Sequence, residues 1–100
     1  MGVKSKSKQY LIFRTYSAGC FAGYMKERKG NEVTIEKARR LWYWEGAASL
    51  SQIAQDGISK PNKCKFPCEV DELTVLECIE ILKVTKKAEK IIKGVPVWQA

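Results

Sequence analysis

The chain has 100 residues, of which 45% are hydrophobic and 29% are charged, and its formal net charge is +7. A chain of this length and balance is typical of one globular domain rather than a disordered protein. Its apolar runs stay short of the ~20 residues that a membrane span needs, and its N-terminus is too polar for a signal peptide. We therefore expect a soluble cytoplasmic protein.

The positive charge is concentrated in the first half of the chain. Residues 1–50 hold ten Lys and Arg against four Asp and Glu, a net of +6, whereas residues 51–100 hold eight against seven, a net of +1. The basic half also carries the aromatic segment discussed below. This asymmetry indicates an anionic partner.

The sequence contains no histidine, so it lacks the commonest general base and the commonest zinc ligand. A nucleophilic mechanism would need Cys or Ser activated by Lys, or a single glutamate base. Glu45 is the only carboxylate within the aromatic segment and is the one candidate for that role. We therefore expect a protein that is not an enzyme and that needs no cofactor.

The four cysteines are Cys20, Cys64, Cys68 and Cys78. Cys64 and Cys68 are spaced C-x3-C rather than the C-x2-C of zinc ribbons. The prediction is that all four are free thiols that behave as small apolar side chains, with no metal site. A zinc site built from all four, or a disulfide, are the alternatives.

Alternating apolar and polar residues predict three strands in the first part of the chain. Gly23 is expected to mark a bulge or a close approach of two backbones. The predicted elements are a disordered basic tail over residues 1–8, strands over 9–16, 20–28 and 32–36, and turns over 17–19 and 29–31.

Residues 37–45 fit two patterns. As a helix they would place Ala38, Leu41 and Trp42 on one stripe, and as a strand they would alternate between two faces. The aromatic run at 41–44 favours the strand.

Two helices have clear end signals. Ser49 can cap the first in a capping box with Gln52, and Gly57 can end it. The second follows Thr85 and ends at Gly94. The remaining predicted elements are a loop over 60–63, an edge strand over 64–70, a strand rather than a buried helix over 74–84, and a closing strand over 95–98.

These elements predict an α+β fold: a mainly antiparallel sheet of five or six strands with two short helices, forming a single domain over residues 9–100. No internal repeat and no interdomain linker is visible in the sequence.

Residues 38–51, ARRLWYWEGAASLS, combine three ingredients of a site for a phosphate-bearing ligand. Guanidinium groups can clamp phosphate, aromatic faces can stack on bases, and serine hydroxyls at a helix start can bind phosphate oxygens. The segment matches neither a phosphate-binding loop nor a dinucleotide fingerprint. The alternative is that the tryptophans build the core and that Ser49 only caps its helix. The candidate ligand-binding residues are Arg39, Arg40, Trp42, Trp44, Ser49, Ser51 and Tyr24.

Three segments carry a resemblance to a known group of proteins. They are RTYSAGCFAGY, ARRLWYWEGAASLSQIAQDG and KCKFPCEV. They resemble a family of short, uncharacterised proteins of tailed phages and prophages, and the resemblance runs from Tyr10 to Trp98. It implies a protein that acts in the cytoplasm of an infected bacterium, and it carries over no functional residue.

The sequence as a whole thus predicts a small binding protein, in the form of a homo-oligomer that sequesters a nucleotide immune signal. A protein that binds DNA or RNA is the second hypothesis, and salt dependence of binding would separate the two. The third is an inhibitor that covers a host protein surface.

Overall fold

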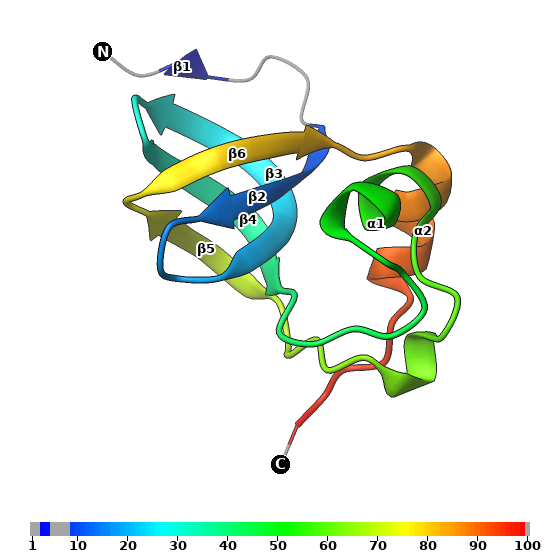
Figure 1. Cartoon of the computed structure of the whole chain (residues 1–100). Helices are drawn as coiled ribbons and strands as arrows, with labels where there is room; N and C mark the ends of the chain where they lie inside the picture. The colour runs from blue at the N-terminus through cyan, green and yellow to red at the C-terminus, as the bar shows by residue number, and fades with distance from the viewer. Residues whose placement is uncertain (1–2, 5–8, 100) are drawn as a thin grey trace.

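The computed structural model describes residues 3–4 and 9–99 of the chain. It contains one antiparallel sheet and two α-helices, so the predicted α+β class is confirmed (Figure 1). The strands are β1 (Val3–Lys4), β2 (Tyr10–Thr15), β3 (Cys20–Lys29), β4 (Glu32–Arg40), β5 (Val70–Val75) and β6 (Cys78–Lys83). The helices are α1 (Leu50–Asp56), the 3₁₀ turn η1 (Pro61–Lys63) and α2 (Lys86–Lys93).

The strand order is β5-β4-β3-β2-β6, with β1 paired to the far end of β3. β5 and β6 stand at opposite ends of this order, yet only Leu76 and Glu77 separate them in the chain. The sheet must therefore curl until its two edges approach, which gives the partly open barrel seen in Figure 1. The backbone N–H of Cys78 donates to Asn31 O at 2.9 Å and ties β6 to the β3–β4 turn.

β1 lies in the segment for which we expected a disordered tail. Val3 pairs with Arg28 and Lys4 pairs with Glu27. The rest of the predicted tail falls outside the described residues.

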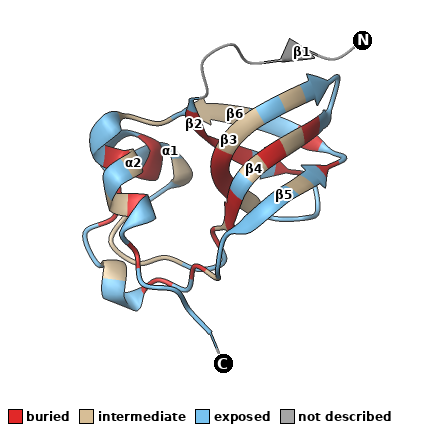
Figure 2. Ribbon diagram, turned by 180° about the vertical axis from the view of Figure 1, so that it is seen from behind, coloured by how far each residue is buried: buried red, intermediate tan, exposed pale blue. Residues whose placement is uncertain are grey.

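β2 is buried on both of its faces, because the molecule has two apolar cores. Leu11 and Phe13 point into the barrel, whereas Tyr10 and Ile12 lie beneath the helices. Figure 2 shows buried residues concentrated on β2, β3 and β4 and on the helix faces turned toward them. The barrel core also contains Phe21, Val33, Ile35, Ala38, Val75 and Cys78, and the helical core contains Ala22, Leu41, Ile53, Ala54, Ile58, Cys64, Phe66, Ile92 and Val95.

Both helices begin and end where their sequences predict. The Ser49 hydroxyl accepts from Gln52 N at 3.2 Å and the Gln52 side chain accepts from Ala48 N at 2.8 Å, which satisfies two free donors at the start of α1. Gly57, with φ of 80°, ends α1. The Thr85 hydroxyl caps α2 by accepting from Ala88 N at 3.1 Å. None of the helices in the described residues is long and apolar enough to cross a membrane.

The predicted strand over 37–45 is right only as far as Arg40. Arg40 pairs with Phe21, and β3 begins just before, at Cys20. Residues beyond Leu41 therefore have no β3 residue left to pair with, and only Tyr43 forms an isolated bridge, with Lys65. The aromatic run has strand propensity but no partner strand.

Three later predictions needed correction. The strand over 74–84 is two strands, because the chain turns at Leu76 and Glu77. In the predicted edge strand over 64–70, Lys65 and Phe66 form only isolated bridges, and Pro67 has no N–H to continue a ladder. The closing strand over 95–98 is likewise reduced to one bridge, between Val97 and Phe66.

Gly23 lies where β3 and β4 approach most closely. The register shifts between Ala22 and Tyr24. A Cβ at position 23 would lie 2.6 Å from Ile35 Cγ2 and 2.9 Å from Glu36 O. The predicted close approach is therefore confirmed, and only glycine fits here.

We expect Gly23→Ala to lower the free energy of unfolding by at least about 2 kcal/mol, because the added methyl overpacks the barrel wall. Gly94→Ala is the control, since Gly94 has φ of −85° and its Cβ would be 3.3 Å from the nearest atom, Lys90 O. That change should shift stability by less than about 1 kcal/mol. Urea denaturation measures both, and equal losses would contradict the packing argument.

Candidate functional site

Arg39, expected to clamp a phosphate, is instead buried between the sheet and the helices. It is 4% exposed. Its guanidinium donates to Ile92 O at 2.9 Å, Val95 O at 2.6 Å, Phe66 O at 3.2 Å and Pro67 O at 3.1 Å. Burial lowers the pKa of this guanidinium, but arginine stays charged in proteins. The donors of Arg39 are thus occupied by carbonyl groups of the chain itself, which gives this residue a structural role.

Arg40 lies at the end of β4 and is partly exposed. Its guanidinium stacks 4.5 Å from the centre of the Phe21 ring and donates to Ala18 O at 2.7 Å. It lines two surface cavities, of about 320 Å³ and about 240 Å³, and Trp42 lines the smaller of them. Arg40 therefore keeps donors beside open space, next to an exposed indole ring.

The three consecutive aromatics do not act as a unit. Trp42 is 64% exposed and Tyr43 is 43% exposed. Trp44, in contrast, packs against the helical core. The chain leaves the sheet at this point, so each side chain faces a different environment. Trp42 and Tyr43 are thus exposed enough for stacking on a ligand to stay a prediction, whereas Trp44 contributes to the core.

Tyr43 has neighbours from two distant parts of the chain. Lys65 Nζ lies 5.6 Å from the ring centre of Tyr43 and 5.6 Å from that of Trp98. The Tyr43–Lys65 bridge and the hydrogen bond from Trp98 N to Phe66 O, at 2.9 Å, hold the three segments together. Trp98 is 46% exposed.

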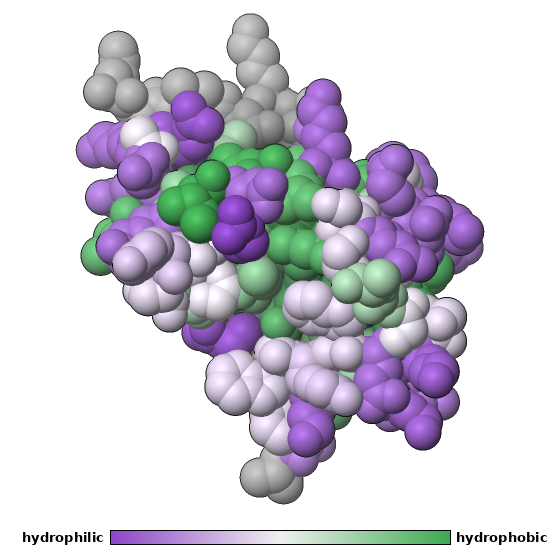
Figure 3. All heavy atoms as spheres, viewed as in Figure 1, coloured by the Kyte–Doolittle hydropathy of each residue, from purple (hydrophilic) through white to green (hydrophobic). Residues whose placement is uncertain are grey.

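The exposed and half-exposed residues form two groups, Arg40 with Trp42 and Lys65 with Tyr43 and Trp98, which follow each other directly in the chain at residues 42 and 43. We call the two groups together the aromatic-basic surface, and it consists of Arg40, Trp42, Tyr43, Lys65 and Trp98. Figure 3 shows a mostly pale surface at the lower end of the molecule, near the C-terminus, and strongly hydrophilic residues over the helices.

The Tyr43 hydroxyl donates to the Glu45 carboxylate at 2.8 Å. This hydrogen bond to Glu45 raises the pKa of Tyr43. The phenol is therefore neutral at ordinary pH and adds no negative charge to the surface. Glu45, the one carboxylate considered for catalysis, has this hydrogen bond and no neighbouring histidine.

Ser49 and Ser51 lie at the start of α1. The Ser49 hydroxyl serves as the helix cap, and Ser51 is exposed, with a hydroxyl that forms no hydrogen bond with another described residue. Both lie outside the contacts that define the aromatic-basic surface. The cap function accounts for Ser49, and a helix of seven residues offers little charge to an anion.

Tyr24 lies in a different part of the molecule, packed edge-on against Tyr10 with ring centres 5.2 Å apart. It lines a separate cavity, with Lys37 and Lys93 among the other lining residues. The structure therefore does not bring Tyr24 together with the aromatic run.

The four cysteines are free thiols, but only Cys64 and Cys78 are buried as expected of small apolar side chains, and Cys20 is half-buried. Cys64 is buried and its thiol points to Lys60 O at 3.5 Å, whereas Cys68 is exposed. Burial raises the pKa of Cys20 and of Cys78. Within the described residues, no group of three or more Cys, Asp or Glu side chains is placed to hold a metal ion.

Sequence reasoning missed Lys65 and Trp98. Both are far from residues 38–51 in the chain, and only the paired segments bring them beside Tyr43. The sequence feature that could have pointed to Lys65 is the KPNKCKF stretch, which places three lysines within a few residues of an aromatic.

Arg39→Ala should lower the free energy of unfolding by at least about 3 kcal/mol, because it leaves four buried carbonyl groups without their charged donor. Arg39→Lys should restore only part of this loss, since an ammonium group cannot span all four. Arg40→Ala, which removes one hydrogen bond at a half-exposed site, should cost about 1 kcal/mol or less. Chemical denaturation gives all three values, and equal losses for the two alanine variants would refute the structural role.

Comparison with known proteins gives a family but no function. No curated protein and no solved structure matches the chain. The model of one family, described as a domain of unknown function (DUF6948), matches residues 8–92 and so covers all but the ends of the fold described above. The chain belongs to this family, DUF6948.

Proposed function

We propose that the protein is a non-enzymatic binding module for a phosphate-bearing ligand, and that this ligand is single-stranded nucleic acid bound on the aromatic-basic surface. The observation that carries the proposal is the exposure of three aromatic side chains, Trp42, Tyr43 and Trp98, beside two cations.

Single-stranded nucleic acid is recognised by stacking of its bases on aromatic rings, without a need for an enclosed pocket. Indole and phenol rings that are about half exposed offer such faces. A structural role alone would favour burial of rings this large, as happens to Trp44. Open aromatic faces at neighbouring positions support binding of successive bases.

The phosphates between the bases need cations at similar spacing. Arg40 and Lys65 stand beside the rings, and Lys60 and Lys63 are exposed on the segment that leads to Lys65. Lys65 also lies over the faces of Tyr43 and Trp98, which keeps its ammonium close to the stacking surface. The net charge of +7 favours a polyanion over an isolated anion.

A nucleotide sponge is the second candidate, and the position of Arg40 favours it. Arg40 lines two cavities, and Trp42 lines the smaller one beside it. A guanidinium and an indole at a cavity can hold the phosphate and the base of one nucleotide. Because this cavity is small and open, an enclosed site would need a second copy of the chain, so this candidate requires a homo-oligomer.

The cellular context is part of the proposal. The resemblance of three segments to short proteins of tailed phages and prophages supports action in the cytoplasm of an infected bacterium. A single-strand binder there would coat replicating or transcribed phage nucleic acid.

The direct test is fluorescence anisotropy with labelled oligothymidylate at about 50 and about 200 mM NaCl. Trp42→Ala and Trp98→Ala should each weaken binding by about fivefold or more, since loss of one stacked base costs roughly 1–3 kcal/mol. Lys65→Ala should weaken binding and reduce its salt dependence. Lys87→Ala, which removes the same charge from an exposed position on α2, is the control and should change little.

Binding of oligothymidylate that is unaffected by Trp42→Ala and Trp98→Ala would refute the proposed surface. Absence of oligonucleotide binding, together with tight binding of one cyclic or oligomeric nucleotide at high salt, would replace the proposal with the sponge. If neither ligand binds, the exposed aromatics would be those of a protein-binding surface.

A further inference from the structure

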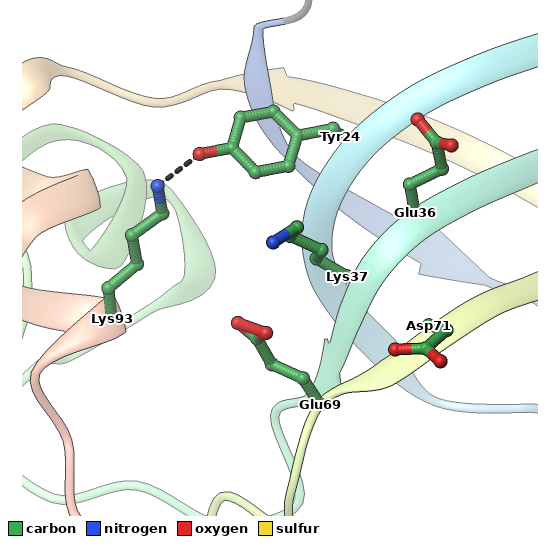
Figure 4. Close-up of a pocket in the computed structure, with 6 residues that line it drawn as sticks. All are labelled: Tyr24, Glu36, Lys37, Glu69, Asp71 and Lys93. Carbon is green, nitrogen blue, oxygen red and sulfur yellow. Dashed lines mark hydrogen bonds between the residues drawn. The ribbon is translucent and has the colours of Figure 1, made fainter.

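A second site lies apart from the aromatic-basic surface. A cavity of about 580 Å³ opens between the C-terminal end of α2, strands β3 and β4, and the start of β5. It is lined by Tyr24, Glu36, Lys37, Glu69, Asp71 and Lys93, as shown in Figure 4. It shares no residue with the aromatic-basic surface, so whatever binds there is recognised by different chemistry.

Lys37 enters this cavity from an unusual backbone. It has φ of 51°, the only positive φ recorded for a non-glycine residue in the described part of the chain. It sits at a bulge, where two residues of β4, Lys37 and Ala38, lie opposite one residue of β3, Gly23. A bulge of this kind re-aims a side chain, and in Figure 4 the Lys37 ammonium points into the cavity.

A left-handed backbone is disfavoured for lysine, and glycine would adopt it without strain. The chain nevertheless carries lysine here, and its side chain is exposed rather than packed. Packing of the side chain therefore does not explain why lysine rather than glycine occupies position 37. A charged group held at a strained position beside a cavity is the pattern found at binding sites.

A second cation comes from α2. Lys93 donates to the Tyr24 hydroxyl, and to the Glu89 carboxylate at 2.9 Å. Its ammonium also lies 4.7 Å from the Tyr24 ring centre and 5.1 Å from that of Tyr10. These contacts hold Lys93 and the Tyr24 hydroxyl at one wall of the cavity, as the dashed line in Figure 4 marks.

Two carboxylates line the same cavity from the segment at the start of β5. Glu69 and Asp71 come from the start of β5, and in Figure 4 the Glu69 carboxylate extends toward the space that Lys37 and Lys93 face. Neither Glu69 nor Asp71 forms an ion pair with Lys37, or with any other residue that the structure describes. Lys37 and these two carboxylates thus face one cavity without a direct ion pair between them, whereas Lys93 is paired with Glu89.

This arrangement selects the charge of a ligand. A pure anion would be attracted by Lys37 and Lys93 but repelled by the three lining carboxylates, those of Glu36, Glu69 and Asp71, and a pure cation would meet the reverse. A molecule with both charges satisfies both groups. We propose that the cavity binds a free amino acid, whose carboxylate contacts Lys37 and the Tyr24–Lys93 pair and whose ammonium contacts Glu69 and Asp71.

Lys37→Gly is the decisive variant, because glycine keeps the left-handed backbone and removes only the side chain. It should fold with a melting temperature equal to or above that of the unmodified protein. It should weaken amino-acid binding at least tenfold. Lys87→Ala, with the same change of charge on the exposed face of α2, should leave binding unchanged.

Saturation-transfer NMR with each free amino acid identifies the ligand, and isothermal titration calorimetry gives its Kd. Acetate and propylamine, each with one of the two charges, should bind at least tenfold more weakly than that amino acid. Glu69→Gln with Asp71→Asn should also weaken binding at least tenfold.

The proposal is overturned if no amino acid binds, if acetate binds as well as the amino acid, or if Lys37→Gly binds normally. The inference does not rest on the nucleic-acid proposal. Lys37→Gly should keep full oligothymidylate binding, and Trp42→Ala should keep full amino-acid binding, so failure of one proposal is distinguishable from failure of the other.

Discussion

The structure depends on one buried guanidinium. Arg39 is the next-to-last residue of β4. It donates to four carbonyl groups from two segments that are far away in the chain. These carbonyls belong to the chain before β5 and to the end of α2. A charge that is 4% exposed needs several strong acceptors, because burial without them costs several kcal/mol. Arg39 therefore favours the one arrangement of helices on the sheet that brings these four carbonyl groups to its guanidinium.

That arrangement also decides which residues meet at the surface. Phe66 O accepts from Arg39 at 3.2 Å and from Trp98 N at 2.9 Å. The carbonyl that stabilises the buried charge thus also fixes the C-terminal tryptophan beside Lys65. The same segment bridges to Tyr43 through Lys65. The aromatic-basic surface and the Arg39 contact thus share one acceptor, the carbonyl of Phe66.

The two surfaces differ in how they are built. Most of the aromatic-basic surface lies on irregular chain held by isolated bridges, and its two charged residues, Arg40 and Lys65, are both cations. The cavity beside Lys37 lies between bulged strands and the end of α2, and both cations and carboxylates line it. The bulge at Lys37, with Gly23 opposite it, bends β4 locally and directs the Lys37 side chain into the cavity.

Much of the fold could be predicted from local patterns. The helix caps at Ser49 and Thr85, the close approach at Gly23 and the strand alternation in the first forty residues depend on neighbours in the chain, and each was predicted correctly. The site could not be predicted in the same way. Arg39 and Arg40 are identical in type and adjacent, yet one is in the core and one is at the surface, because consecutive strand residues point to opposite faces and the helices cover only one of them.

The two tryptophans separate for another reason: β4 ends at Arg40, and in the irregular chain that follows Trp42 is exposed whereas Trp44 packs against the helical core. The sequence by itself determined the composition of the molecule: its net charge, its lack of histidine, its α+β class and the positions of its helices. Only the tertiary structure decided which cations and rings are free to meet a ligand. That choice depends on long-range pairing, in which residues such as Lys65 and Trp98 become neighbours through contacts that no local pattern encodes.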